Sequence, residues 1–159
     1  MPGSDAVQDV RLLRMQLLYG SQYHGPVTTV LLTRDLGTDP DGVLGVLTDA
    51  EQHSALVRHP VVVTAAAGAP VQFAPEEGDG YVMEVLDGSH VTLALRPPSF
   101  PETHYSTVTF LTKVTPEGTT RLTLYQQNVP AALAPAMEAA WRRDYLDPLA
   151  ERFPPGGTS

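Results

Sequence analysis

Hydrophobic and polar residues alternate along two segments in the second half of the chain, residues 104–113 and 119–126. Successive side chains of a β-strand point to opposite faces of a sheet, so each segment presents one mostly apolar face. The residues predicted to share the inward face are Ser106, Val108, Phe110, Leu122, Leu124 and Gln126. The intervening Pro116-Glu117-Gly118 is typical of a turn, so the two segments are expected to form a hairpin in an antiparallel sheet that is covered on one side.

Residues 131–153 follow a helical period instead. Apolar residues recur every four positions, at Leu133, Met137, Trp141, Tyr145, Leu149 and Phe153. This spacing predicts a long amphipathic helix, with a kink near Pro148 because proline lacks a backbone donor. The apolar faces of the helix and the sheet must both leave water. We therefore expect an α+β fold in which a curved antiparallel sheet wraps around the C-terminal helix.

The earlier part of the chain supplies the other predicted strands. They are short apolar or β-branched runs bounded by Gly, Pro or Asp, at residues 27–34, 61–64, 71–74, 81–86 and 91–96. The Asp87-Gly88 pair is a strong signal for a tight hairpin between the last two. With the C-terminal hairpin, these segments predict a sheet of about seven strands.

Two short helices are predicted after the first strand. Asp39 would cap the first helix, with Pro40 at its first position. Thr48 and Glu51 have the three-residue spacing of a capping box, which predicts that the second helix begins at Thr48. Pro60 is expected to end it.

The two ends of the chain lie outside this pattern. In residues 1–26, Ser4 would cap a helix that runs to about Tyr19, with an apolar face made by Val7, Val10, Leu13 and Leu17. A strand is the alternative, because Leu13, Met15, Leu17 and Tyr19 also alternate. This extension would pack on its own domain or on a second copy of the chain, or would serve as a lid or a partner-binding arm. Residues 154–159 have the composition of a disordered tail.

Composition narrows the class of protein. A chain of 159 residues with 42% hydrophobic and 18% charged residues is typical of one soluble globular domain. Its net charge of −8 argues against a nucleic-acid partner and against an anionic membrane surface. The chain has no cysteine, which excludes disulfides and thiolate chemistry. No apolar run reaches the ~20 residues of a membrane span and no signal-peptide pattern begins the chain, so we expect no membrane insertion and a cytoplasmic location.

Several motifs resemble the family of activators of the heat-shock-protein-90 ATPase. They are His104–Phe110, Gly118–Gln126, Val129-Pro130, Glu138–Leu149 and, upstream, Val46–His53. The most specific is the ending Trp141…Tyr145…Pro148-Leu149. That family belongs to the START-like, polyketide cyclase and plant-allergen (SRPBCC) superfamily. The resemblance implies the helix-grip fold for residues 27–153, with the two short helices bracing the open end of the sheet.

The chain also departs from the pattern of this family. Leu95 stands where an aromatic residue often precedes the equivalent of Arg96. The family's paired tryptophans are absent, because residues 53–57 read His-Ser-Ala-Leu-Val, and Gly68-Ala69-Pro70 replaces a common Gly-Gly. These differences would reshape the pocket and its mouth.

A cavity between sheet and helix would be the site in such a fold. The residues predicted to bind a ligand there are Tyr81, Met83, Arg96, Ser106, Val108, Phe110, Leu122, Leu124, Gln126, Met137 and Trp141. The candidates for acid or base catalysis are His53, His104, Tyr145 and Glu84. Buried polar groups need hydrogen-bond partners, which a ligand, the backbone or water can supply. The five histidines lack the spacing of metal ligands, and the chain has neither a Gly-x-Ser-x-Gly motif nor a phosphate-binding loop, so we expect no metal and no cofactor.

Three functions are compatible with these observations. The leading hypothesis is binding of a small hydrophobic, aromatic or polyketide-like molecule. The second is a cofactor-independent cyclase, dehydratase or isomerase that acts on a polyketide-like intermediate. The third is a co-chaperone-like activator of a heat-shock ATPase, as the resemblance implies. The partners considered are thus a small hydrophobic molecule, a heat-shock ATPase and a second copy of the chain.

Overall fold

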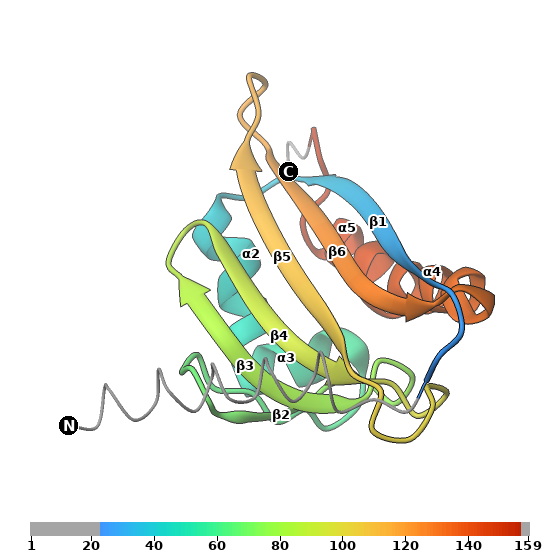
Figure 1. Cartoon of the computed structure of the whole chain (residues 1–159). Helices are drawn as coiled ribbons and strands as arrows, with labels where there is room; N and C mark the ends of the chain where they lie inside the picture. Colours follow the sequence, from blue (N-terminus) through green and yellow to red (C-terminus); the bar gives the residue numbers. More distant parts are fainter. Residues whose placement is uncertain (1–22, 157–159) are drawn as a thin grey trace.

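One antiparallel sheet forms the frame of the molecule (Figure 1). The computed structural model describes residues 23–156, so the predicted N-terminal helix lies outside the described residues. Six strands follow the spatial order β1-β6-β5-β4-β3-β2. Their bounds are β1 Val27–Leu36, β2 Pro70–Gln72, β3 Asp79–Leu86, β4 His90–Arg96, β5 Ser106–Val114 and β6 Thr120–Pro130. The curved sheet and the long C-terminal helix agree with the predicted α+β architecture.

The predicted count of seven strands is wrong. Residues 61–64 make only a single antiparallel bridge, between Val62 and Gln72. This short segment buries Val61 and Val63, but it does not form the continuous series of backbone hydrogen bonds that defines a strand. The sheet therefore ends at β2, which pairs with β3 over only three residues.

Two short helices, α2 (Pro40–Thr48) and α3 (Ala50–Val57), lie on one face of the sheet (Figure 1). Asp39 caps α2 as predicted, because its carboxylate accepts a hydrogen bond of 2.7 Å from the Gly42 N–H. The predicted cap of α3 is wrong: Asp49 takes this position, and its carboxylate accepts from the Gln52 N–H at 3.0 Å. The Thr48 hydroxyl is already used inside α2, where it donates to the Leu44 carbonyl.

The C-terminal helix is continuous from Ala131 to Arg152 but changes its winding. It consists of η1 (Ala131–Leu133), α4 (Ala134–Trp141), the π-helical turn η2 (Arg142–Leu146) and α5 (Asp147–Arg152). In η2 the Asp147 N–H donates to the Arg142 carbonyl, five residues earlier. The irregularity expected at Pro148 is thus a wide turn placed just before the proline. No helix within residues 23–156 is long and apolar enough to cross a membrane.

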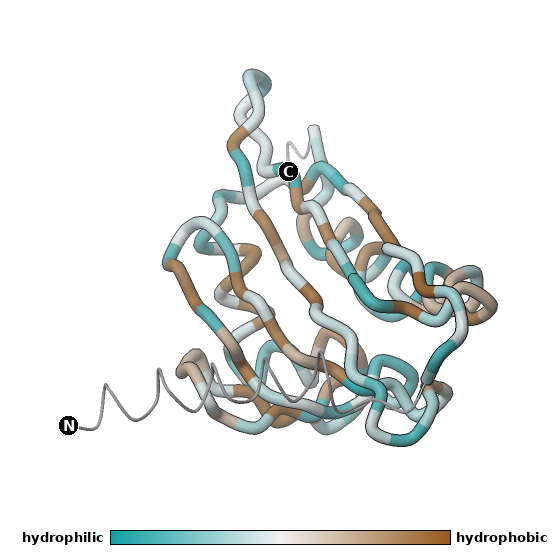
Figure 2. Tube along the Cα trace, in the orientation of Figure 1, coloured by the Kyte–Doolittle hydropathy of each residue, from teal (hydrophilic) through white to brown (hydrophobic). Residues whose placement is uncertain are grey.

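The core lies between the sheet, the two short helices and the C-terminal helix. Figure 2 shows hydrophobic positions alternating with paler ones along β4 and β5. Val108, Phe110, Leu122 and Leu124 are buried on the inner face, as the alternation predicted. Trp141 and its neighbours on the C-terminal helix pack against them in one hydrophobic cluster.

A tight turn at residues 74–78 connects β2 to β3. The Ala74 carbonyl accepts hydrogen bonds from the N–H groups of Glu77 and Gly78, both at 3.1 Å. Gly78 has φ +89°, and a Cβ there would clash with the backbone of Arg96. Glycine therefore allows this turn to lie close to the end of β4, which directs Glu77 into the protein.

Candidate functional site

A chain of hydrogen bonds crosses the interior from the helix to the sheet. The Trp141 indole N–H donates to Gln126 Oε1 at 2.8 Å, and Gln126 Nε2 donates to Ser106 Oγ at 3.0 Å. The Ser106 hydroxyl in turn donates to the Leu95 carbonyl at 2.7 Å. The structure thus brings together three of the predicted ligand-binding residues, and it supplies each with a partner from the protein itself.

His53 and Tyr145 form a second buried polar group. His53 Nδ1 lies 2.9 Å from the Leu47 carbonyl, which only accepts, so this nitrogen carries the proton. Its Nε2 therefore accepts from the Tyr145 hydroxyl at 2.8 Å, and that hydroxyl accepts from the Ala74 N–H at 3.1 Å. Burial lowers the pKa of His53 to about 4, partly offset by the hydrogen bond to Leu47, and burial raises the pKa of Tyr145 well above its usual range.

Aromatic rings fill the space around these polar groups. The Trp141 and Tyr145 ring centroids are 5.0 Å apart, and the Phe110 ring lies edge-on to Trp141 at 5.8 Å. Phe73 stacks on Tyr145 at 5.7 Å and meets His53 edge-on at 4.5 Å. The centre of the space between sheet and helix is therefore occupied by protein side chains.

An apolar groove opens beside the centre. Three segments form it: the 74–78 turn, the loop after β4 and the start of the C-terminal helix. The groove has a volume of about 320 Å³ and is lined by Pro75, Glu76, Pro98, Ser99, Ala136, Met137 and Ala140. We call it the helix groove. Met137 is the one predicted ligand-binding residue among its lining residues.

Arg96 holds one wall of the helix groove in place. Its guanidinium group donates to the carbonyls of Pro101 at 3.3 Å and Phe100 at 3.4 Å. Phe100 is buried and its ring lies 5.9 Å from that of His104, whose Nε2 is 2.8 Å from the Asn128 carbonyl. Arg96 and His104, both predicted site residues, thus anchor the loop whose Pro98 and Ser99 line the groove.

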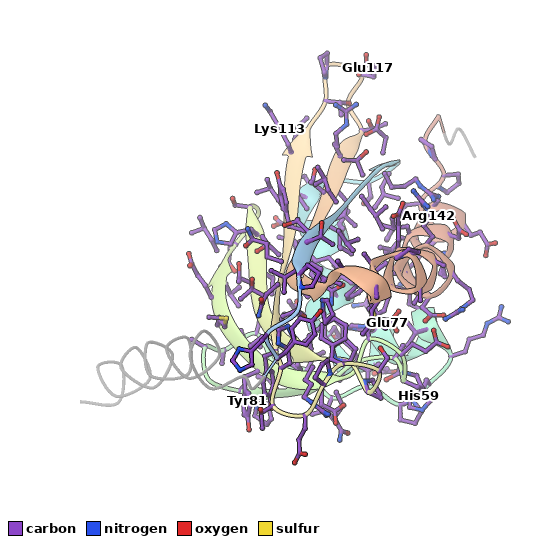
Figure 3. All side chains as sticks on the ribbon, turned by 45° about the vertical axis from the view of Figure 1, so that its right-hand side comes forward. His59, Glu77, Tyr81, Lys113, Glu117 and Arg142 are labelled. Carbon is purple, nitrogen blue, oxygen red and sulfur yellow. The ribbon has the colours of Figure 1, made fainter. Side chains whose placement is uncertain are left out.

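Glu77 lies behind the opposite wall, beside the C-terminal helix (Figure 3). Its side chain is fully buried beside the Asp144 carboxylate, which acts on it both as a hydrogen-bond partner and through its negative charge. Burial, followed by the hydrogen bond to Asp144 and the charge of its carboxylate, raises the pKa of Glu77 to about 9. Glu77 is therefore a neutral carboxylic acid at pH 7.

A surface ion-pair network covers Glu77. Arg143 donates to Asp144 at 2.9 and 3.0 Å and to Glu76 at 2.6 Å. Burial opposes ionisation of Asp144, but the hydrogen bonds from Arg143 and Glu77 and the charge of Arg143 prevail and lower its pKa. The charged carboxylate of Asp144 and the neutral acid Glu77 thus lie next to each other at the seam between turn and helix.

A second groove, of about 560 Å³, separates α3 from the end of the C-terminal helix. It is larger, but its lining is dominated by opposite charges: Arg58, Arg143, Asp144, Asp147, Glu151 and Arg152. Water competes strongly for such exposed groups, so this groove offers little apolar contact to a ligand.

Three predicted site residues lie away from these groups. Tyr81 is 38% exposed, and Glu84 is exposed and pairs with His90 at 3.1 Å. Met83 lies next to the core residue Val82 on β3 and faces the other side of the sheet, where it joins Ala94 and Tyr105 in a separate small cluster. The structure therefore does not bring Tyr81, Met83 or Glu84 to the helix groove.

Glu77 and Phe73 were not among the site residues predicted from the sequence. Pro75–Gly80 has the composition of an exposed acidic loop, and Glu76 and Asp79 are indeed exposed. The only signal that set Glu77 apart was its place just before Gly78, where a turn reverses the chain. Within residues 23–156, no three His, Asp or Glu side chains are grouped so as to hold a metal ion.

The chain has relatives among known proteins, both in sequence and in fold. No protein-family model matches the chain. It is 24% identical over 128 residues to the human activator of 90 kDa heat shock protein ATPase homolog 1, a match that covers 80% of the chain and 38% of that protein. A crystal structure of an HSP90 activator from Plasmodium falciparum superposes with a TM-score of 0.71 and 20% identity, covering 78% of this chain and 94% of that one.

These matches agree with the motifs of the C-terminal hairpin and helix. The chain is similar in sequence to activators of the 90 kDa heat shock protein ATPase, and it has the START-like fold. The fold also occurs in DynU16, a protein of the dynemicin biosynthetic locus, with a TM-score of 0.65 and 18% identity, covering 79% of this chain and 47% of that one. The chain spans about two fifths of the length of its human relative, 38%.

Proposed function

We propose that the protein binds a small hydrophobic molecule in the helix groove. The observation that carries the proposal is the lining of this groove, in which Pro75, Pro98, Ala136, Met137 and Ala140 are apolar. Its volume of about 320 Å³ lies at the lower end of the range typical of small-molecule sites. Burial of apolar ligand surface against these side chains supplies the affinity.

The walls of the groove favour a preformed site. Arg96 fixes the loop that carries Pro98, and the tight 74–78 turn fixes Pro75. A site that is already ordered loses little entropy when a ligand binds. The small side chains of Ala136 and Ala140 leave the space along the helix that a larger residue would fill.

The positions of the candidate acid–base residues favour ligand binding over catalysis as the function of the groove. His53 and Tyr145 are fully buried and already bonded to each other, and Glu84 lies on the surface. Geometry comes first for a general acid or base, which must reach the reacting atom. The proposal therefore assigns no turnover to these residues.

Native mass spectrometry of the freshly purified protein tests this proposal. We expect a stoichiometric apolar adduct that is released on denaturation. Ala136→Phe should abolish the adduct, because Ala136 lines the groove. Ala139→Phe is the matched control, since Ala139 is exposed on the same helix but does not line the groove. An adduct that survives Ala136→Phe, or a bare protein that also ignores added aromatic hydrocarbons, would contradict the proposal.

A second candidate is activation of a heat-shock ATPase. It is favoured by the similarity to the human activator and to the Plasmodium protein. Stimulation of ATP hydrolysis by the 90 kDa heat-shock protein of the same organism measures it. Because such a partner would contact the surface, stimulation should persist in the Ala136→Phe variant. An unchanged ATPase rate at saturating concentrations of this chain would exclude this function.

A further inference from the structure

Two apolar side chains are buried on the outer face of the sheet, opposite the face that packs against the helices (Figure 1). On β4, Ala94 lies between the inward-facing Leu93 and Leu95, so its side chain points outward. Met83 of β3 packs against it there, and the partly buried Tyr105 completes the group. Met83 is only 2% exposed and Ala94 is fully buried. We call Met83, Ala94 and Tyr105 the outer patch.

The described residues provide little cover for the outer patch. Among residues 23–156, Tyr105 is the one buried or partly buried hydrophobic side chain that packs against Met83 and Ala94. Other side chains on this face are open to water: Leu31 is 57% exposed, and Tyr81, which pairs with Ala94, is 38% exposed. A side chain as long as methionine reaches so low an exposure only when other groups pack over it. The outer patch therefore requires a further apolar segment above it.

Residues 1–22 join the described fold beside the outer patch. The Tyr23 ring meets the His104 ring edge-on at 5.1 Å, and Tyr105 is the next residue along the chain. The Tyr23 hydroxyl donates to the Pro26 carbonyl at 3.0 Å, which holds Tyr23 close to the start of β1. The helix that the sequence predicts for residues 4–19 would be about 24 Å long. The distance from β5 to β3 is only about 10 Å, because neighbouring strands lie ~4.8 Å apart, so this segment is long enough to cross the patch.

We propose that residues 4–19 pack across the outer face of the sheet and cover the outer patch with their apolar side chains. The apolar face predicted for this segment consists of Val7, Val10, Leu13 and Leu17. Burial of apolar surface on both sides stabilises the contact, and polar residues of the segment such as Gln8 face water. The cover prevents this apolar part of the sheet from associating with other proteins. It is independent of ligand binding in the helix groove, whose lining residues include none of the outer patch.

Oxidation of methionine by hydrogen peroxide, followed by mass spectrometry of the peptides, tests the proposal in the full chain. In the wild type, Met83 should be oxidised as slowly as Met137, which is 3% exposed on the inner side of the sheet. Leu13→Asp places a charge on the predicted apolar face. It should raise the oxidation rate of Met83 about tenfold, because a carboxylate cannot be buried against the patch without a large cost. Met137 should keep its wild-type rate, which shows that the core stays folded.

The matched control is Gln8→Asp, which adds the same charge to the polar side of the predicted helix. Met83 should remain protected in this variant. An unchanged Met83 rate in Leu13→Asp, or equal acceleration in both variants, would overturn the proposal. Protection that is lost on dilution of the wild type would overturn it as well, because a second copy of the chain would then be the cover.

A measurement on the wild type decides the question even if Leu13→Asp loses its fold. We expect nuclear Overhauser contacts between the methyl group of Met83 and the methyl groups of Leu13 or Leu17, since such contacts require direct packing. Contacts of the Met83 methyl group that are limited to residues 23–156 would contradict the proposed position of residues 4–19.

Discussion

Nε2 of His53 lies 2.8 Å from the hydroxyl oxygen of Tyr145, and both side chains are fully buried. This hydrogen bond joins α3 to the π-helical turn of the C-terminal helix. The Ala74 N–H adds the turn after β2 to the same group. One hydroxyl thus connects three segments that are far apart in the sequence, which makes it a central element of the packing between helices and sheet.

Tyr145→Phe should lower the free energy of unfolding by about 1–3 kcal/mol, because it leaves His53 Nε2 and the Ala74 N–H buried without partners. Urea unfolding followed by circular dichroism measures the effect. Tyr125→Phe is the control, since Tyr125 lies on β6 and is only partly buried. Equal stability of the two variants would contradict a structural role for the Tyr145 hydroxyl.

His53 should make the protein less stable in acid. Its native pKa of about 4 lies below the usual value of 6.5, because burial disfavours the charged ring. As pH falls from 6.5 to 4, the unfolded chain takes up the proton first, so the native state loses about 3 kcal/mol of stability over this range. His53→Gln should remove this part of the pH dependence, whereas the exposed His59→Gln should keep it. Parallel stability curves for wild type and His53→Gln between these pH values would refute the assignment.

The contribution of Glu77 to the free energy of unfolding should depend on pH in the opposite direction. Its native pKa of about 9 lies above the usual value of 4.5, since burial and Asp144 favour the neutral form. Between these values the unfolded chain releases the proton first, so stability falls as pH rises, by up to ~1.4 kcal/mol per pH unit. The Glu77→Gln variant cannot ionise at this position, so its free energy of unfolding should increase relative to that of the wild type as pH rises.

The neighbouring Glu76→Gln is the control for that comparison. Glu76 is exposed and pairs with Arg143, so its replacement should change stability by less than ~1 kcal/mol at any pH. If the Glu77→Gln and wild-type curves stay parallel from pH 5 to pH 9, Glu77 is ionised in the native protein.

Trp141→Ala should cost about 3–5 kcal/mol, because it removes a fully buried ring and leaves Gln126 Oε1 without its donor. Trp141→Phe keeps most of the ring packing and isolates the hydrogen bond. It should therefore destabilise the protein less than the alanine variant does. Thermal unfolding of the two variants gives the comparison, and a neutral Trp141→Ala would show that the helix does not pack on the sheet as described.

The sheet faces and the long helix could be predicted from the sequence because both follow from local periods. Alternation at Val108 and Leu124 placed these residues in the core correctly, and the four-residue spacing of Met137, Trp141 and Tyr145 gave the buried helix face. Residues 61–64 have the composition of a strand, but pairing depends on a partner strand of sufficient length. That information is not local, so the count of seven strands was too high by one.

The candidate site was harder to predict than the fold. Whether Ser106 and Gln126 bind a ligand or each other depends on distances across β5 and β6 that no single segment encodes. Glu77 appeared to be part of an exposed acidic loop, and only the close approach of Gly78 to Arg96 turns it inward. Met83 was assigned to the cavity although it neighbours the inward-facing Val82, and alternation along β3 places it in the cluster on the other face of the sheet.

Methyl NMR of the methionines tests ligand binding in the helix groove most directly. Met137 lines the groove, whereas Met83 lies in the separate cluster with Ala94, so one spectrum contains both the probe and its control. On titration of the ¹³C-methyl-methionine protein with the aromatic hydrocarbon 2-ethylnaphthalene, the Met137 signal, assigned through Met137→Leu, should shift saturably while the Met83 signal stays in place. A Met137 signal that does not move, or equal shifts of both signals, would contradict binding in the groove.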